Sequence, residues 1–245
     1  WGASAPFAGL LADRHGAGRV LAGSALLYVL GLALMAYPIA PWFFVLSAGV
    51  LIGLGLSGVT FSVVQGVIGR RYPPEKRSMA LGISAAAGSF GQFALLPLTQ
   101  WLLTGLGWHG ALIVLAAVGL LMVPLAVGMV EKRSAHAAHL FQQSAGQAMR
   151  EALGHRGYLF LTAGFFVCGF QVVFVGVHLP AYLADRGFPP HVAVIALALV
   201  GLFNIVGTWT SGWLGGRMPK RWILSAIYLG RAVVIALFLW LPISL

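Results

Sequence analysis

An arginine in the middle of an apolar segment is the residue best placed to bind a substrate. Arg231 lies nine residues after Trp222 and is the one charged residue between positions 222 and 245. Nine residues of helix rise about 13 Å, which places Arg231 near the middle of a hydrocarbon core about 30 Å thick. A guanidinium at that depth costs about 2.5–3.5 kcal/mol, so we expect it to face a cavity and to suit the carboxylate of an anionic substrate. The alternative is a structural pair with backbone carbonyls or with an acid outside this sequence.

Neutral polar side chains in similar segments are further candidates. A polar group in lipid is costly without a partner, so each of them either lines a cavity or bridges two helices. The substrate-binding candidates that join Arg231 are Asn204, Gln65, Gln171 and His178. All five acidic residues lie in or beside predicted loops. A carboxylate that carries a coupling proton would therefore have to come from outside this sequence. Uncoupled transport and exchange transport, which need no such carboxylate, are equally open.

Other kinds of chemistry have no residues to support them. The sequence shows no serine–histidine–acid set and no phosphate-binding loop, so we expect neither an enzyme nor a bound cofactor. His136 and His139 are three residues apart, but no third metal ligand is evident. Cys168 is the single cysteine, which excludes an internal disulfide, and we expect it to be a small packing residue.

The composition indicates that the surrounding solvent is lipid. Hydrophobic residues make up 60% of the chain and charged residues 8%, with a mean hydropathy of +0.92, whereas a soluble domain has about 25% charged residues. The net charge of +10 would suit a nucleic acid, but the Lys and Arg residues form short clusters between long uncharged runs, as in the loops of membrane proteins. We therefore expect contacts with membrane lipid and none with nucleic acid.

The apolar runs predict the membrane-spanning helices, each of which needs about 20 apolar residues. Seven runs qualify, at residues 20–37, 42–69, 78–106, 111–130, 158–184, 192–216 and 222–245. Residues 1–11 are too few to span and are interpreted as the end of a helix that begins before this sequence. Alternate loops hold 13 of the 15 basic residues, and the loops between them hold only Arg186. By the positive-inside rule, the basic loops are cytoplasmic.

The polar stretch 131–157 divides the spans into two groups. We predict an N-terminal helical half at residues 1–130, a cytoplasmic linker at 131–157, and the start of a C-terminal half at 158–245. Within the linker, an interfacial amphipathic helix is one interpretation, because its apolar residues have the right spacing; they are Leu140, Phe141, Met149 and Leu153. A solvated linker is the alternative.

Two of the basic turns share a pattern of glycine and charge. In each, an arginine follows a glycine by five residues: Arg14 follows Gly9, and Arg217 follows Gly212, 203 residues later. The glycine lets helices approach closely, and Asp13 can accept from helix N-terminal amides. The predicted cytoplasmic gate consists of Gly9, Asp13, Arg14, Gly16, Arg19, Gly212, Arg217 and Arg221. The alternative is a pair of loops that only set the topology.

The first turn resembles the signature of the major facilitator superfamily, G-x-x-x-[DE]-[RK]-x-G-x-[RK]-[RK], which lies between that family's second and third helices. The matching residues are Gly9, Asp13, Arg14, Gly16 and Arg19, while Gly18 stands where a basic residue is usual. The second turn resembles the degenerate copy of this signature that lies between the family's helices eight and nine. It lacks the acid, where Gly216 stands, and the second glycine, where Pro219 stands. The resemblance implies an all-α membrane protein: a helical bundle of which this sequence covers a partial helix two to helix nine of twelve.

A finer resemblance is to the monocarboxylate and oxalate–formate branch, in a bacterial form, and it rests on residues 77–97 and 178–187. Proton-coupled animal members of that branch carry an Asp and an Arg four residues apart on helix eight. Here the aligned positions are Asn204 and Thr208, which argues against symport of a monocarboxylate with a proton.

These observations lead to one functional hypothesis and two alternatives. The hypothesis is a monomeric secondary transporter of the inner or plasma membrane that moves a small organic anion, such as a monocarboxylate, by alternating access. An exporter of amphipathic compounds is the first alternative, because an apolar cavity would suffice for it. A non-transporting sensor on the same fold is the second, and it would be expected to carry a regulatory domain.

Overall fold

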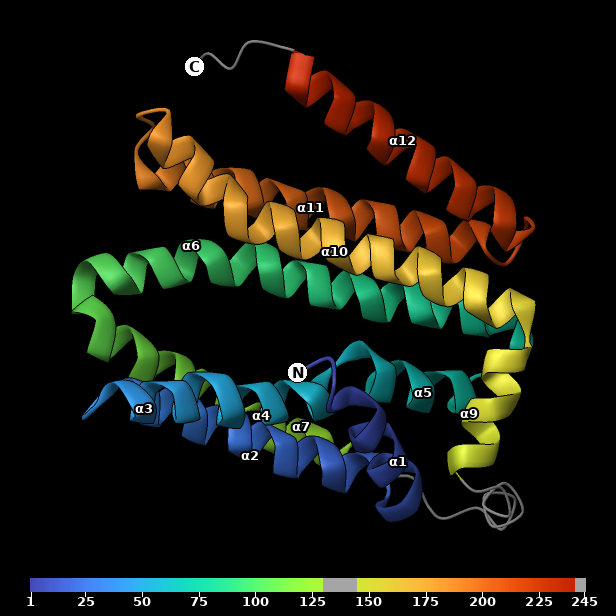
Figure 1. Ribbon diagram of the computed structural model, residues 1–245, viewed down its shortest axis with the longest axis horizontal. Helices are drawn as coiled ribbons and strands as arrows, with labels where there is room; N and C mark the ends of the chain where they lie inside the picture. The colour runs from blue at the N-terminus through green and yellow to red at the C-terminus, as the bar shows by residue number, and fades with distance from the viewer. Residues whose placement is uncertain (130–144, 241–245) are drawn as a thin grey trace.

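The computed structural model describes residues 1–129 and 145–240, and every regular element in these ranges is helical. The N-terminal part contains α1 (Ala5–His15), α2 (Ala17–Met35), α3 (Pro41–Phe44), the π-helix η1 (Val45–Leu51), α4 (Ile52–Val59), α5 (Phe61–Arg71), α6 (Pro74–Leu120) and α7 (Met122–Val127). The C-terminal part contains α9 (Ala145–Gly154), α10 (Arg156–Asp185), α11 (Pro190–Leu214) and α12 (Lys220–Trp240). The long helices run roughly side by side (Figure 1). The predicted all-α membrane fold is confirmed.

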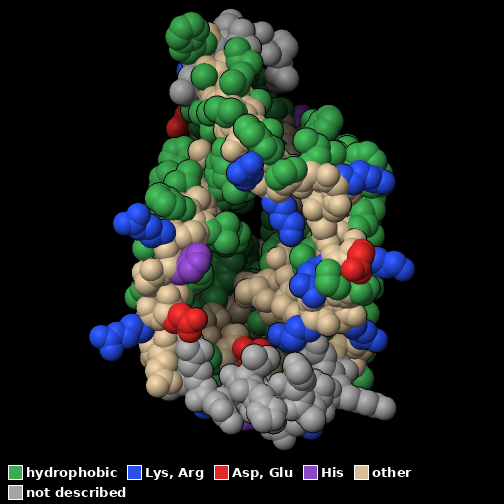
Figure 2. Space-filling view, turned by 90° about the vertical axis from the view of Figure 1, so that its right-hand side faces the viewer, with side chains coloured by type: hydrophobic (Ala, Val, Ile, Leu, Met, Phe, Trp, Pro, Cys, Tyr) green, Lys and Arg blue, Asp and Glu red, His purple; other side chains and the backbone are tan. Residues whose placement is uncertain are grey.

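The basic turns gather at one end of the bundle, as the alternation of charge predicts. In Figure 1 the α1–α2, α5–α6, α9–α10 and α11–α12 connections all lie at the right-hand end, and the α2–α3 and α10–α11 connections lie at the left. Seen from that right-hand end, Lys and Arg side chains surround a central hollow (Figure 2). The positive-inside rule predicts that this end is cytoplasmic, and it is called the cytoplasmic end below.

The span count differs from the predicted seven because two spans form one continuous element. Six stretches in the described residues are long and apolar enough to cross a membrane, and one of them covers Pro74–Val127. The 47 residues of α6 would reach about 70 Å as a straight helix, more than twice a hydrocarbon core. Gly107, with φ 68° and ψ −175°, interrupts the helix, and the ribbon reverses there (Figure 1). The reversal falls within residues 107–110, the short turn that separates the predicted spans 78–106 and 111–130.

The predicted span at 42–69 is broken in the structure. It begins with α3, continues as the π-helix η1, and changes from α4 to α5 at Thr60, whose ψ of 165° is extended. The Thr60 hydroxyl donates to the carbonyl of Ser57 at 3.1 Å and lies 2.9 Å from the Ser62 hydroxyl. These side chains supply part of the hydrogen bonding that the backbone loses at the break. Hydropathy alone did not reveal the interruption.

Close backbone contacts hold the N-terminal helices together. A Cβ placed on Gly55 of α4 would lie 2.6 Å from the backbone nitrogen of Tyr28 on α2, and one on Gly31 would lie 2.7 Å from a side-chain carbon of Ile52. Small residues permit such approaches between membrane helices. Two buried clusters support this packing, one around Leu21 and Val67 and one around Leu32 and Leu112. The helices α2 and α4 therefore form one tightly packed unit.

The N-terminal and C-terminal parts meet where α6 lies along α11. A Cβ on Gly82 would lie 2.7 Å from the Cα of Gly212, and one on Gly201 would lie 2.7 Å from the backbone nitrogen of Phe93. The helices touch backbone to backbone near the cytoplasmic end and again about three turns deeper. In contrast, the side chains along α10 and α12 are largely exposed and apolar.

Part of the predicted linker is a short helix. The segment Ala145–Gly154 forms α9, and its apolar residues Met149 and Leu153 are exposed. This favours the amphipathic-helix interpretation for that part of the linker. The predictions for Leu140 and Phe141, and for the histidine pair at 136 and 139, lie outside the described residues. The division of the chain at 130 and 157 stays a prediction.

Candidate functional site

The side chain of Arg231 meets α10 halfway along that helix. Its Nη1 donates to Oε1 of Gln171 at 3.2 Å and lies 3.5 Å from Sγ of Cys168. All three residues are half-buried. The structure thus brings together two of the predicted substrate-binding residues, Arg231 and Gln171, from positions sixty residues apart in sequence.

The partners of Arg231 are neutral. Among the described residues, no carboxylate lies within 4 Å of the Arg231 guanidinium. The ion pair found in these residues joins Arg70 to Asp13. In the described residues, the hydrogen-bond partners of Arg231 are side chains and not backbone carbonyls, and a pair with an acid outside this sequence stays open. A guanidinium has five N–H donors, and the contacts with Gln171 and Cys168 use Nη1 alone. Its positive charge is therefore uncompensated by the described residues and can attract an anion.

Two residues that support Arg231 were not identified from the sequence. The Tyr228 hydroxyl donates to the carbonyl of Gly164, which ties α12 to α10 one turn before Arg231. Cys168 was expected to be a packing residue, yet its half-buried thiol contacts the guanidinium. The missed signal was spacing: Gly164, Cys168 and Gln171 follow one face of α10, and Tyr228 is three residues before Arg231 on α12.

The remaining substrate-binding candidates lie apart from this cluster. Asn204 is exposed on α11, and its backbone carbonyl accepts from Thr208 Oγ1 at 2.6 Å. Gln65 is half-buried on α5. His178 is exposed near the outer end of α10, with its ring centroid 4.6 Å from that of Phe174. In the described part of the chain, no hydrogen bond joins these three side chains to Arg231. Their roles stay predictions.

Asp13, in the first of the two predicted gate turns, forms an ion pair with a residue of another helix. Oδ1 of Asp13 on α1 lies 3.5 Å from Nη1 of Arg70 on α5, and both side chains are about half exposed. From the sequence, Asp13 can accept from helix N-terminal amides; in the structure its ion-pair partner is Arg70. Gly16 ends α1 with a φ of 91°, a conformation that glycine adopts most readily.

The other residues of the first turn make fewer contacts. Arg14 and Arg19 are exposed and form no ion pair with the described acids. A Cβ on Gly9 would meet nothing within 4 Å, so the close helix approach predicted there is absent among the described residues. Gly9 differs in this respect from its counterpart Gly212.

The second gate turn places arginines against tryptophans. The guanidinium carbon of Arg217 lies 3.8 Å from the ring centroid of Trp213, and that of Arg221 lies 5.7 Å from the Trp222 ring. Cation–π contacts of this kind hold the side chains at the membrane surface. Gly212 forms the close contact with Gly82 described above. No group of three metal-ligating side chains occurs within residues 1–129 and 145–240.

Comparisons with known proteins agree with these features. The family profile described as "Major Facilitator Superfamily" matches residues 2–245. The chain is 29% identical over 214 residues to "Monocarboxylate transporter 13" of Bos taurus, covering 87% of this chain and 49% of that protein. It is 29% identical to "Monocarboxylate transporter 11" of Mus musculus (95% and 53%) and 24% identical to "Putative niacin/nicotinamide transporter NiaP" of Bacillus subtilis strain 168 (91% and 56%). The chain spans about half the length of these relatives.

Proposed function

Because this chain belongs to the major facilitator superfamily and is a multi-pass membrane protein, we propose that it is part of a secondary transporter for a small organic anion. A monocarboxylate is the proposed substrate. Transport proceeds by alternating access, in which the two helical halves move about a central site. The transporter is monomeric and resides in the inner or plasma membrane.

The observation that carries this proposal is the position of Arg231. Its guanidinium lies opposite the middle of a 30-residue helix, beside neutral partners. A charge at this depth is costly, and an incoming carboxylate would offset that cost through charge-assisted hydrogen bonds. Gln171 holds one guanidinium nitrogen in place and leaves other donors for the substrate. Two of the relatives are named as monocarboxylate transporters, which supports the same substrate class.

The coupling mechanism is proposed to be uniport or exchange. Asn204 and Thr208 on α11 occupy the positions that align with the Asp and the Arg of proton-coupled animal members of the monocarboxylate branch. The Thr208 hydroxyl donates to the carbonyls of Asn204 and Ile205, so it is engaged within its own helix. Neither residue titrates near neutral pH. The described part of the spans thus offers no carboxylate to carry a proton beside Arg231.

An apolar cavity favours a second candidate function, the export of amphipathic compounds. A space of about 420 Å³ lies between α6, α10 and α11 near the outer end, and its lining is apolar apart from Thr99 and Gln100. A cavity of this kind suits an amphipathic molecule. Such an exporter would not depend on Arg231, which separates the two candidates experimentally.

The deciding experiment is uptake of radiolabelled monocarboxylates into vesicles that contain the complete protein. We expect saturable uptake, its loss in Arg231→Ala, and partial retention in Arg231→Lys, which keeps the charge but loses the planar donor set. Arg186→Ala is the matched control, because Arg186 lies over the Tyr182 ring outside the spans. Uptake that is absent in the wild type or unchanged in Arg231→Ala would exclude the anion proposal.

The gate residues are proposed to latch the cytoplasmic side during the cycle. The Asp13–Arg70 ion pair joins α1 to α5 at the end where the basic turns gather. An exposed pair contributes little free energy, so it can open and close readily. The adjacent basic side chains are proposed to contact anionic lipid headgroups.

A further inference from the structure

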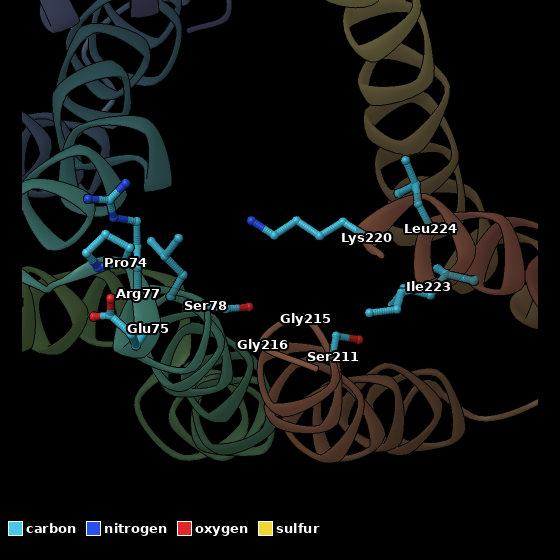
Figure 3. Close-up of a pocket in the computed structure, with 12 residues that line it drawn as sticks. Pro74, Glu75, Arg77, Ser78, Ser211, Gly215, Gly216, Lys220, Ile223 and Leu224 are labelled. Atoms are coloured by element: carbon cyan, nitrogen blue, oxygen red, sulfur yellow. The ribbon is translucent and has the colours of Figure 1, made fainter. Parts of the chain in front are cut away.

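A cavity at the cytoplasmic end of the bundle has no role in the function proposed above. It measures about 530 Å³ and lies between the start of α6, the end of α11 and the start of α12. Figure 3 shows these three segments around the opening, and Figure 2 shows the hollow at this end of the molecule. The volume is sufficient for a small organic acid and several waters.

The polar groups of this cavity are those that an anion requires. Lys220 extends across the opening towards Ser78, and the hydroxyls of Ser78 and Ser211 point into the same space (Figure 3). Among the described acids, none lies within 4 Å of the Lys220 ammonium. The lining contains two cations, Arg77 and Lys220, and one acid, Glu75, a net charge of +1. The Glu75 carboxylate is on the far side of Ser78 from Lys220 (Figure 3).

The wall of the cavity is closely packed where the hydroxyls are attached. Gly82 and Gly212 bring α6 and α11 into backbone contact. Ser78 lies about one helical turn before Gly82, and Ser211 is the residue before Gly212. Gly215 leaves the space that the Ser78 hydroxyl occupies, since a Cβ there would collide with it. The contact between the two helices thus fixes the backbone that carries the two hydroxyls, whereas Lys220 has a flexible stem.

The same face of α12 leads from this cavity to Arg231. Lys220 and Arg231 are eleven residues apart, which is close to three helical turns and about 16 Å. Ile223, Leu224 and Ile227 line the cavity between them. One stripe of α12 thus has a cation at the cytoplasmic end, an apolar stretch, and a second cation at mid-membrane.

We propose that this cavity is a cytoplasmic binding site for the carboxylate of the transported anion, with Lys220 as its cation and the hydroxyls of Ser78 and Ser211 as additional donors. The proposal rests on the function proposed above. The carboxylate pairs with Lys220 when it enters from or leaves to the cytoplasm, and with Arg231 when it is at mid-membrane. Lys220 thereby raises the affinity of the inward-facing side for the substrate.

The test measures binding without transport. A cysteine introduced in the complete protein as Ile223→Cys, at a lining residue that supplies no donor to the proposed site, is labelled from the cytoplasmic side with a charged methanethiosulfonate reagent, and the parent protein gives the background from other cysteines. The vesicles contain phosphatidylcholine alone or phosphatidylcholine with phosphatidylglycerol. Propionate is the carboxylate probe.

We expect propionate to slow the labelling in both kinds of vesicle. In a Lys220→Gln background, the concentration for half protection should rise on the order of tenfold, as for the loss of one charge-assisted hydrogen bond. Lys220→Arg should retain most of the protection. Lys76→Gln is the matched control, because Lys76 is a basic residue of the same segment of α6 but is not part of the lining. In this variant, propionate should protect the cysteine at the same concentration as in the wild type.

Three results would overturn the proposal: no protection by propionate, protection that is unchanged by Lys220→Gln, or protection that requires phosphatidylglycerol and is insensitive to propionate. The last result would assign the site to a lipid headgroup. The test is independent of the uptake assay. If uptake is absent while propionate protects, the transport function fails and the anion site stands; if uptake depends on Arg231 without any protection, only the cytoplasmic site fails.

Discussion

Nη1 of Arg231 on α12 donates to Oε1 of Gln171 on α10 across 3.2 Å. The amide of Gln171 holds the guanidinium without neutralising its charge, and a carboxylate in its place would do both. This difference makes position 171 the most informative place to test whether the charge of Arg231 serves a substrate.

Gln171→Glu should abolish uptake of organic anions while the protein stays folded. The new carboxylate would pair with Arg231 at the same position and compete with the substrate for the guanidinium. Uptake and thermal stability in detergent are the two measurements. Gln171→Leu is the control, because it removes the hydrogen-bond acceptor, costs about 1.5–3 kcal/mol, and leaves the charge of Arg231 free. Normal uptake by Gln171→Glu would show that Arg231 does not bind the substrate.

Asp13→Asn should slow transport several-fold and change stability by less than about 1 kcal/mol. Both side chains of the Asp13–Arg70 pair are about half exposed, and exposed pairs contribute little to the free energy of unfolding. Initial uptake rates and the melting temperature in detergent check the two parts. Asp13→Glu keeps the charge and should restore much of the rate. If Asp13→Asn transports at the wild-type rate, the turn sets topology only.

Gly212→Val should destabilise the protein by about 1–3 kcal/mol, the usual cost of overpacking. A Cβ at this position would lie 2.8 Å from the Cα of Gly82, so α6 and α11 would have to separate. Gly207→Val on the same helix is the matched control, because a Cβ there meets nothing within 4 Å. Thermal unfolding should distinguish the two variants, and equal melting temperatures would contradict the close contact.

Gly16→Ala should lower stability by about 1–3 kcal/mol, because a positive φ strains residues that have a Cβ. Gly16 has a φ of 91° at the junction of α1 and α2. Gly23→Ala, in open space within α2, should instead be neutral or slightly stabilising. Melting temperatures of the two variants provide the comparison, and a loss confined to Gly23→Ala would refute this reading of the turn.

The architecture was predicted from the sequence to a large extent. Apolar runs between basic clusters predicted an all-α membrane protein, and the structure and the family match confirm it. Residues 1–11 were interpreted as the end of a helix, and α1 covers Ala5–His15. The basic turns were predicted to lie on one side, and they do so (Figure 1). The predicted turn at 107–110 contains the reversal at Gly107, although α6 runs through it as one element.

The break at Thr60 and the contacts of the site were decided by tertiary structure. Gln171 and Arg231 were each singled out as polar residues in apolar segments, but nothing in the sequence paired them with one another or with Cys168. From the sequence, Asp13 can accept from helix amides, and in the fold its ion-pair partner is Arg70. The cavity beside Lys220 is lined by α6, α11 and α12, segments that only the tertiary structure brings together.

The physical reason is the range over which each signal acts. Hydropathy and charge are summed along neighbouring residues, and transfer from water to lipid depends on that local sum, so spans and orientation follow from the sequence alone. Which side chains meet depends on how each helix is rotated about its axis and on its neighbours, both of which are set by packing between distant segments. The sequence therefore determined that Arg231 lies within the membrane, and only the tertiary structure decided that it lies beside Gln171.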